Sequence, residues 1–285
     1  MGMSGSSVGS DARVSRQKRG VGRGSLSRII GYSYLLFGYF VLYLPIVLIA
    51  VYSFNSAERG TLWCGFTLRW YQELFTNHGL MTVTWHSFVL GFLAAGLATV
   101  LGTVIATAVF RYRFLARQAL YNMSNVLILM PEIIVAVFLL LLYTIIDMSL
   151  GFWSLLIAHV ALGVPFVTIT VFGRVVVLDS NLIEAATDLG ASDWIIWRYV
   201  LLPLLWPAIA VGWILSFTLS MDDFMVSYFV GGPNFNILPS KIYSMARFGV
   251  RPEINALCTL ILLFAVIAIL LSYYFLNRKV KVTKI

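Results

Sequence analysis

The chain has 285 residues, of which 60% are hydrophobic and only 11% are charged, and its formal net charge is +8. Soluble domains carry about a quarter charged residues, so this composition excludes an ordinary soluble protein, whose core would need more polar sequence to cover it. The basic residues cluster beside apolar runs, which indicates a membrane-topology signal and argues against nucleic acid as a partner. Cys64 and Cys258 lie far apart and do not imply a disulfide framework.

The first stretch, residues 1–28, is rich in Gly, Ser and Arg and has no apolar run, which predicts a disordered basic cytoplasmic tail. The apolar segment 29–53 is too long for a signal peptide and lacks a small-residue cleavage site, so we expect a retained membrane span. The following outer loop, residues 54–85, is rich in aromatic side chains, as is typical of a membrane interface. Within it, Trp70 is a candidate contact to a ligand or a docking protein.

The spans set the overall architecture. A membrane-crossing helix needs about 20 mostly apolar residues, and six segments meet this need: 29–53, 86–110, 120–146, 151–173, 204–230 and 254–276. Fifteen of the 20 Lys and Arg residues lie in the two terminal tails and in the second and fourth connections. By the positive-inside rule both termini are cytoplasmic. The sequence therefore predicts an all-α, polytopic membrane protein with a six-span domain at 29–276 and a cytoplasmic C-terminal tail at 277–285.

The third predicted span carries an acidic residue, Glu132, directly after Pro131. Proline interrupts a helix and frees backbone carbonyls, which a cavity can use. Glu132 therefore has two open readings: it faces a translocation path, or it is a buried acid hydrogen-bonded to a neighbouring span. In the fourth span, His159 is expected to make a helix–helix hydrogen bond in preference to serving as a proton relay.

The cytoplasmic loop at 174–203 is the most informative connection. Ser180 or Asn181 can cap a short amphipathic helix, and Gly190 fits its end. A second amphipathic piece follows, and Pro203 opens the next span, where its missing N–H does no harm. The loop is thus expected to be a compact helix-turn-helix with small residues where a partner can approach. The residues assigned to this docking surface are Glu184, Ala185, Ala186, Gly190 and Asp193.

The fifth predicted span contains Asp222 and Asp223. On a helix, Asp223 shares a polar stripe with Ser216, Ser220 and Ser227 at spacings of i, i+4, i+7 and i+11, and Asp222 flanks this stripe. Polar stripes within a span face a bundle interior or water. Carboxylates here suit cationic cargo, since they can pair with ammonium groups. The alternatives are pairing with a basic residue of a partner subunit and capping of an outer helix end.

No enzyme signature occurs in the sequence. It has no Gly-x-x-x-x-Gly-Lys-Ser/Thr loop for phosphates, no Gly-x-Ser-x-Gly elbow and no His/Cys metal pattern. We therefore expect neither catalysis nor a cofactor or metal in this chain. A non-transporting membrane scaffold is one alternative, but the acids in mid-span are costly and favour transport.

The loop sequence resembles the EAA loop of bacterial binding-protein-dependent ABC importers. Their pattern is Glu-Ala-Ala, three residues, Gly, nine residues, then Ile-x-Leu-Pro; here Val200 stands in place of Ile. The resemblance implies the type I permease fold and a coupling helix that docks on a separate ATP-binding subunit. Five further strings are similar to those of the spermidine/putrescine permeases, most of all their C-type subunit: 53–56, 151–156, 216–223, 238–245 and 252–257.

This second resemblance implies a complex in the bacterial inner membrane, surrounded by lipid. Its other members would be an ATP-binding subunit dimer, a second similar permease and a periplasmic polyamine-binding protein, with spermidine or putrescine as cargo. Another organic cation or ferric ion remains an alternative cargo. The N-terminal tail is longer than expected for the C-type subunit.

Overall fold

The computed structural model describes residues 23–57, 62–112, 114–179, 181–233, 235–247 and 252–282, and in these ranges it is almost entirely helical. The helices are α1 (Arg23–Tyr52), α2 (Arg69–Thr76), α3 (His78–Arg111), α4 (Arg117–Leu129), α5 (Glu132–Ile145), α6 (Phe152–Val175), α7 (Asn181–Asp188), α8 (Asp193–Ile195), a π-helix (Ile196–Leu201), α9 (Leu202–Asp222), α10 (Met225–Val230), α11 (Leu238–Arg247) and α12 (Pro252–Val282). The fold is therefore all-α, as predicted.

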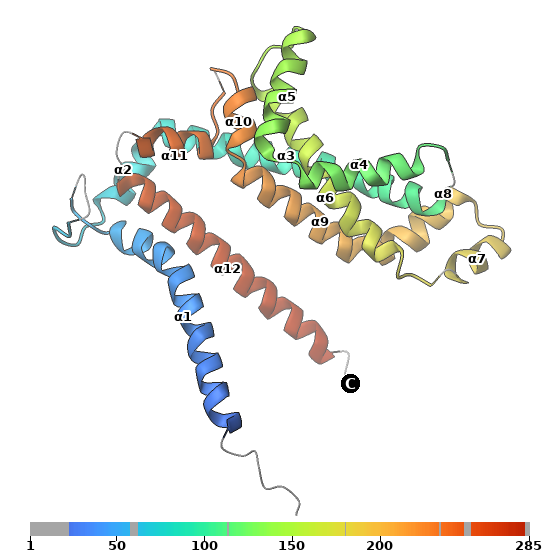
Figure 1. Cartoon of the computed structure of the whole chain (residues 1–285), viewed down its shortest axis with the longest axis horizontal. Helices are drawn as coiled ribbons and strands as arrows, with labels where there is room; N and C mark the ends of the chain where they lie inside the picture. The colour runs from blue at the N-terminus through green and yellow to red at the C-terminus, as the bar shows by residue number, and fades with distance from the viewer. Residues whose placement is uncertain are drawn as a thin grey trace, which may run out of the picture.

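Three long helices, α3, α6 and α9, pack together as the central bundle (Figure 1). Small residues bring their backbones close. A side chain on Gly102 would lie 2.7 Å from Val167, and one on Gly163 would lie 2.2 Å from the Ser216 hydroxyl. Alanines of α3 such as Ala98 are fully buried. This is the packing expected between membrane helices, where close approach replaces the hydrophobic effect as the source of stability.

Toward one end of the bundle, α5 packs on α10 and α10 packs on α6, around a buried apolar cluster. At the other end, α7 and α8 project with the π-helix, over a second apolar cluster. The first cluster draws most of its buried residues from α3, α5, α6 and α10, and the second draws its own from α3, α6, the π-helix and α9. Helices α2 and α11 lie at one end of the bundle and α7 and α8 at the other (Figure 1).

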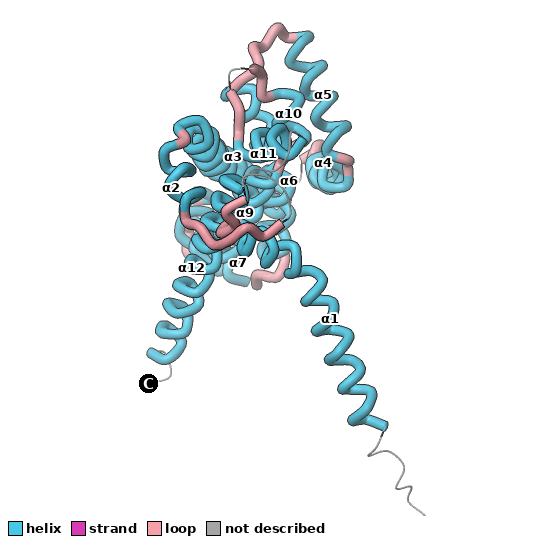
Figure 2. Tube along the Cα trace, turned by 90° about the vertical axis from the view of Figure 1, so that its left-hand side faces the viewer, coloured by secondary structure: helices cyan, strands magenta, loops and turns pink. Residues whose placement is uncertain are grey.

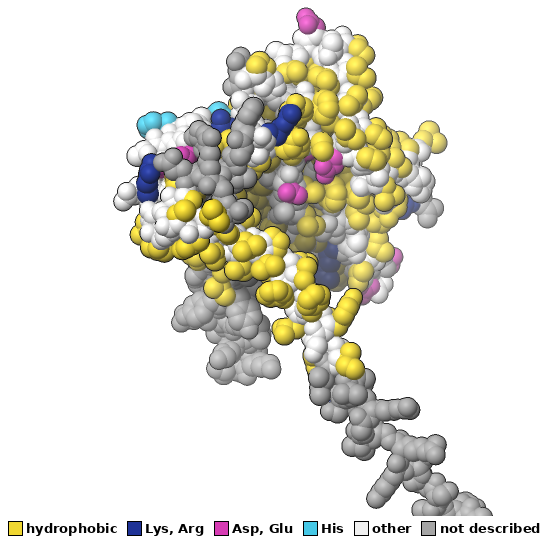
Figure 3. All heavy atoms as spheres, turned by 60° about the vertical axis from the view of Figure 1, so that its left-hand side comes forward, with side chains coloured by type: hydrophobic (Ala, Val, Ile, Leu, Met, Phe, Trp, Pro, Cys, Tyr) yellow, Lys and Arg dark blue, Asp and Glu magenta, His cyan; other side chains and the backbone are white. Residues whose placement is uncertain are grey.

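Helices α1 and α12 diverge from the bundle (Figures 1 and 2). The apolar window of α1 has no residue buried within the chain. Hydrophobic side chains also cover much of the face seen in Figure 3. Surfaces of this size and polarity need lipid or another apolar protein surface against them.

Four helical stretches are long and apolar enough to cross a membrane: Ile30–Tyr52, His78–Arg111, Phe152–Val175 and Asp193–Asp222. The third predicted span corresponds to α4 and α5, which bend by 113° at their junction and make a fifth crossing if counted as one. The last predicted span corresponds to α12, whose described apolar part, Pro252–Ile267, is shorter. The count of six spans stays a prediction.

Two helices continue past the predicted span ends, and the bounds of the membrane domain stay a prediction. Residues 23–28, for which the composition predicts disorder, are helical and begin α1. Helix α12 continues to Val282 and so takes in most of the predicted C-terminal tail. The remainder of the two tails, residues 1–22 and 283–285, lies outside the described residues.

Candidate functional site

A cavity of about 120 Å³ lies where the α4–α5 bend meets α6 and the end of α9. Its polar lining consists of Glu132, His159, Ser220 and Asp223, and the remaining lining is apolar. No lysine or arginine is among the described residues that line it. Three of the predicted pathway residues, Glu132, Ser220 and Asp223, therefore meet at one cavity whose charge is acidic.

The bend between α4 and α5 places Glu132. Met130 and Pro131 have extended backbones, with ψ of 135° and 130°. Proline disfavours helical geometry at the preceding residue and supplies no N–H, so α4 ends before Met130. Glu132 is then the first residue of α5, where a negative charge suits the helix dipole. The interruption predicted from Pro131 is confirmed, but it is a sharp bend.

A second break separates α9 from α10 and places Asp223. Its backbone leaves the helix, with φ of −63° and ψ of 116°. Its carboxylate turns back to cap α10: Oδ1 accepts from the Val226 N–H at 3.1 Å, and Oδ2 accepts from the Ser227 N–H at 2.8 Å. The Ser227 hydroxyl also donates to Oδ2, at 2.7 Å. These bonds satisfy backbone donors that the break leaves without partners.

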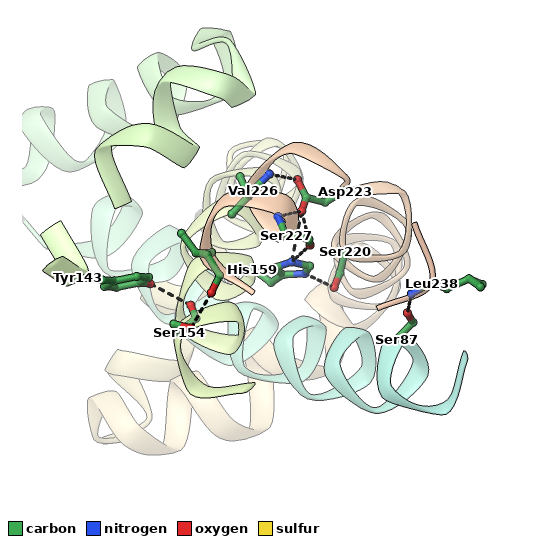
Figure 4. Close-up of polar contacts among 10 residues, drawn as sticks. Ser87, Tyr143, Ser154, His159, Ser220, Asp223, Val226, Ser227 and Leu238 are labelled. Carbon is green, nitrogen blue, oxygen red and sulfur yellow. Dashed lines mark hydrogen bonds and ion pairs between the residues drawn. The ribbon is translucent and has the colours of Figure 1, made fainter. Parts of the chain in front are cut away.

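His159 of α6 connects the two sides of this break (Figure 4). Its ring is 2% exposed. Nδ1 lies 2.6 Å from the Ser220 hydroxyl, and Nε2 lies 3.1 Å from the Ser227 hydroxyl. Nε2 is also 3.4 Å from Oδ2 of Asp223. The predicted helix–helix hydrogen bond of His159 is confirmed, and it reaches two helices.

The single straight helix predicted over residues 204–230 is wrong, because the chain breaks at Asp223. The predicted stripe nevertheless ends up buried: Ser216, Ser220, Asp223 and Ser227 are each at most 7% exposed. The alternative of helix capping also applies, since Asp223 caps α10. Helical periodicity places these residues on one buried face correctly up to Ser220, but it does not predict the end of the helix at Asp222.

Asp222 has a different environment from its neighbour. It is exposed, and it does not line the cavity. Of the three carboxylates, Asp223 and Glu132 therefore line the cavity and Asp222 lies outside it.

Trp70 does not have the environment predicted for a ligand contact. The side chain is 4% exposed, and its indole N–H donates to the Asn55 carbonyl at 2.6 Å. Asn55 in turn binds the loop at Leu62 and Cys64. This buried tryptophan therefore holds the segment at Asn55 against α2, and the contact with a ligand or a docking protein stays a prediction.

The loop between α6 and α9 contains the predicted helix and turn. Helix α7 ends in a Schellman motif: Gly190 N–H donates to Thr187 at 2.9 Å, and Ala191 N–H donates to Ala186 at 3.1 Å. Gly190 has a φ of +82°, which glycine adopts without strain. Ala186 and Ala191 pack on the apolar cluster beneath, as is common for this motif.

The outward face of α7 carries Glu184, Ala185 and Asp188, all exposed. Leu189 after them is 89% exposed. Asp193 is exposed too, but it is anchored: it pairs with Arg111 at the end of α3 and accepts from the Tyr112 hydroxyl at 3.1 Å. Of the five residues assigned to the docking surface, Ala186 instead faces the bundle and Asp193 ties the loop to α3.

Residues 98–282 match the family model described as binding-protein-dependent transport system inner membrane component. The chain belongs to this family. Members are permease components of importers, and this chain is accordingly a multi-pass permease subunit. The matched region includes the cavity residues and the α7 loop.

Named relatives cover nearly the whole chain. It is 43% identical to the spermidine/putrescine transport system permease protein PotC of Escherichia coli (strain K12), over 90% of this chain and 97% of the relative. Identity to PotC of Haemophilus influenzae is 45%, over 82% and 91% of the two chains. Identity to the putrescine transport system permease protein PotI of E. coli (strain K12) is 36%, over 87% and 90%.

Solved permeases of other importers share the fold. A bacterial ABC transporter for import of the acidic polysaccharide alginate aligns with a TM-score of 0.61 at 14% identity, over 92% of this chain and 99% of that one. The inward-facing MetNI methionine ABC transporter aligns with a TM-score of 0.57 at 19% identity, over 70% and 94%. These likenesses support the ABC importer permease fold that the loop resemblance implied.

Proposed function

We propose that this chain is one of two membrane subunits of an ATP-driven importer that carries polyamines, spermidine or putrescine, across the bacterial inner membrane. Its partners would be a second, similar permease, an ATP-binding subunit dimer that hydrolyses ATP, and a periplasmic polyamine-binding protein. The relatives named for spermidine and putrescine support this cargo. Both termini would be cytoplasmic.

One observation carries the choice of a cationic cargo: two broken membrane helices deliver carboxylates to one cavity. Glu132 comes from the α4–α5 bend and Asp223 from the α9–α10 break, and the described lining holds no lysine or arginine. Broken helices with polar groups at mid-membrane are typical of transport sites. Charged groups within spans are costly and mark cargo paths.

The cargo chemistry fits this site. A polyamine has ammonium groups separated by methylenes, so carboxylates can bind the charges while the apolar lining contacts the methylenes. Aromatic rings beside the break, Phe224, Tyr228 and Tyr243, lie with centroids 4.2 to 6.5 Å apart and can accept ammonium groups by cation–π contact. A path must also release its cargo, which favours few and weak contacts.

The test is uptake of labelled spermidine by the assembled complex in membrane vesicles. Glu132→Gln and Asp223→Asn should each lower uptake about tenfold, since each removes a charged partner of the cargo. The matched control is Asp147→Asn, the same chemical change at an exposed loop position with φ of +54°, which asparagine tolerates. Normal uptake by the double variant at normal membrane levels would exclude the acidic site.

Other cargoes are separated by competition. Unlabelled putrescine should compete with spermidine, whereas ferric ion should not. If ferric ion competes and putrescine does not, the same permease carries a different cargo. If the complex forms but takes up neither cargo, a membrane scaffold becomes the better explanation of the chain; the acidic cavity now argues against it.

The α7 loop would couple ATP hydrolysis to transport. We assign the docking contact to its outward face, with Glu184 and Ala185 toward the ATP-binding subunit, because these side chains are exposed. Gly190 and Ala186 would shape and support the helix, and Asp193 would transmit its movement to α3 through Arg111.

A further inference from the structure

We infer that His159 is a positioning residue for the cargo site: through its Nε2–H it fixes Asp223 so that one carboxylate oxygen, Oδ1, is presented to the cationic cargo. This inference rests on the proposed function and deepens it. His159 itself does not contact the cargo. It acts through Asp223, whose Oδ1 binds the ammonium group.

The hydrogen bonds of this cluster place a proton on Nε2 of the ring. The Ser227 hydroxyl donates its only hydrogen to Asp223 Oδ2. It can therefore only accept from Nε2 of His159, which must carry a proton. On the other side of the ring, Nδ1 lies 2.6 Å from the Ser220 hydroxyl. The ring is thus held from both sides, with its Nε2–H directed at the pair formed by Ser227 and Asp223.

The two oxygens of Asp223 are used unequally. Oδ2 accepts two hydrogen bonds from Ser227 and faces Nε2 of His159 at 3.4 Å. Oδ1 accepts only the Val226 N–H among the described residues. A carboxylate has about four lone-pair sites in all, so Oδ2 is fully engaged and Oδ1 keeps capacity. Because Asp223 lines the cavity, Oδ1 is the oxygen that can take an ammonium group.

The cluster is held independently of the far end of α10. Ser154 donates from its hydroxyl to the Val230 carbonyl at 2.8 Å and accepts from the Gly151 N–H at 2.7 Å (Figure 4). Helix α10 is therefore fixed at its beginning by His159 and Asp223, and at its end by Ser154. Substitutions at the two ends therefore have different effects: one at the beginning of α10 displaces Oδ1 of Asp223, whereas one at its end only loosens the helix.

The experiment measures KM and the maximal rate of spermidine uptake by the assembled complex. His159→Leu is expected to raise KM about tenfold, as for loss of support to a charged partner, with a maximal rate per permease close to wild type. His159→Gln, which can donate from the Nε2 position, should recover most of the affinity. His159→Asn, which reaches only the Nδ1 position and Ser220, should not. The control Ser154→Ala should leave KM unchanged.

A second variant covers the case that His159→Leu does not reach the membrane. Ser227→Ala removes the hydroxyl between Nε2 and Oδ2, and it should raise KM by a similar factor. Unchanged KM in His159→Leu or Ser227→Ala, or equal recovery by Asn and Gln, would overturn the inference. So would a rise in Ser154→Ala as large as in His159→Leu. If Asp223→Asn itself leaves KM unchanged, it is the proposed function that fails.

Discussion

Asp222 and Asp223 are neighbours in the chain but do different work because the helix ends between them. Asp222 is the last residue of α9 and stays exposed, whereas Asp223 turns inward, caps α10 and lines the cavity. The break therefore separates the two carboxylates, so that only Asp223 is buried and faces the cavity.

Glu132 is the residue whose role is most easily tested by chemistry. In a background with both native cysteines replaced, Glu132→Cys is expected to react with a water-soluble thiol reagent, because its side chain is exposed and lines the cavity. The control Ala136→Cys, four residues further on α5 and 0% exposed, should stay unreacted. Spermidine should slow labelling of Glu132→Cys. If Glu132→Cys is not labelled either with or without ATP, Glu132 does not face a water-accessible path and its role is structural.

At the scale of elements, the turn after α7 depends on a backbone angle. Space around Gly190 is open: a Cβ there would meet nothing within 4 Å. A β-carbon at this position would therefore clash with no other atom, although steric crowding is the usual reason for a glycine in a tight turn. The obstacle is the φ of +82°, which costs a residue with a β-carbon about 1–2 kcal/mol.

Gly190→Val should consequently weaken coupling, and Gly190→Asn should retain most of it, because asparagine tolerates the left-handed region. The readout is ATPase activity of the assembled complex, stimulated by loaded binding protein. A cost of about 1–2 kcal/mol corresponds to a loss of roughly 5- to 30-fold in the population with the turn formed. Wild-type stimulation in a fully assembled Gly190→Val complex would remove this loop from the coupling route.

Features that act locally could be predicted from the sequence. Apolar runs predict the long helices, Pro131 predicts the interruption between α4 and α5, and Gly190 predicts the turn after α7. The α9–α10 break has no proline or glycine at Asp222 or Asp223. It is stabilised by His159, which lies 64 residues before Asp223 in the chain, so no local sequence pattern predicts it. The only hint in the sequence was a histidine inside a predicted span.

The whole molecule has two unlike ends. One carries α2, α11 and the outer loop that Trp70 holds, and the other carries α7 and α8 (Figure 1). The cavity lies in the wall of the bundle, and α1 leaves its apolar surface uncovered by this chain. Such a surface needs lipid or another apolar protein surface against it, and in the proposed complex the second permease would supply part of that cover.

This arrangement makes the orientation testable with native residues. Cys64 is exposed in the outer loop, whereas Cys258 is partly buried in α12. A membrane-impermeant maleimide added to spheroplasts should therefore label the wild-type chain at Cys64, and Cys64→Ser should abolish that labelling. Ser192→Cys, exposed beside α8, should react only in inside-out vesicles when placed in the Cys64→Ser background. Labelling of Ser192→Cys in intact spheroplasts would reverse the assigned orientation, because the α7 face would then lie outside and away from any ATP-binding subunit.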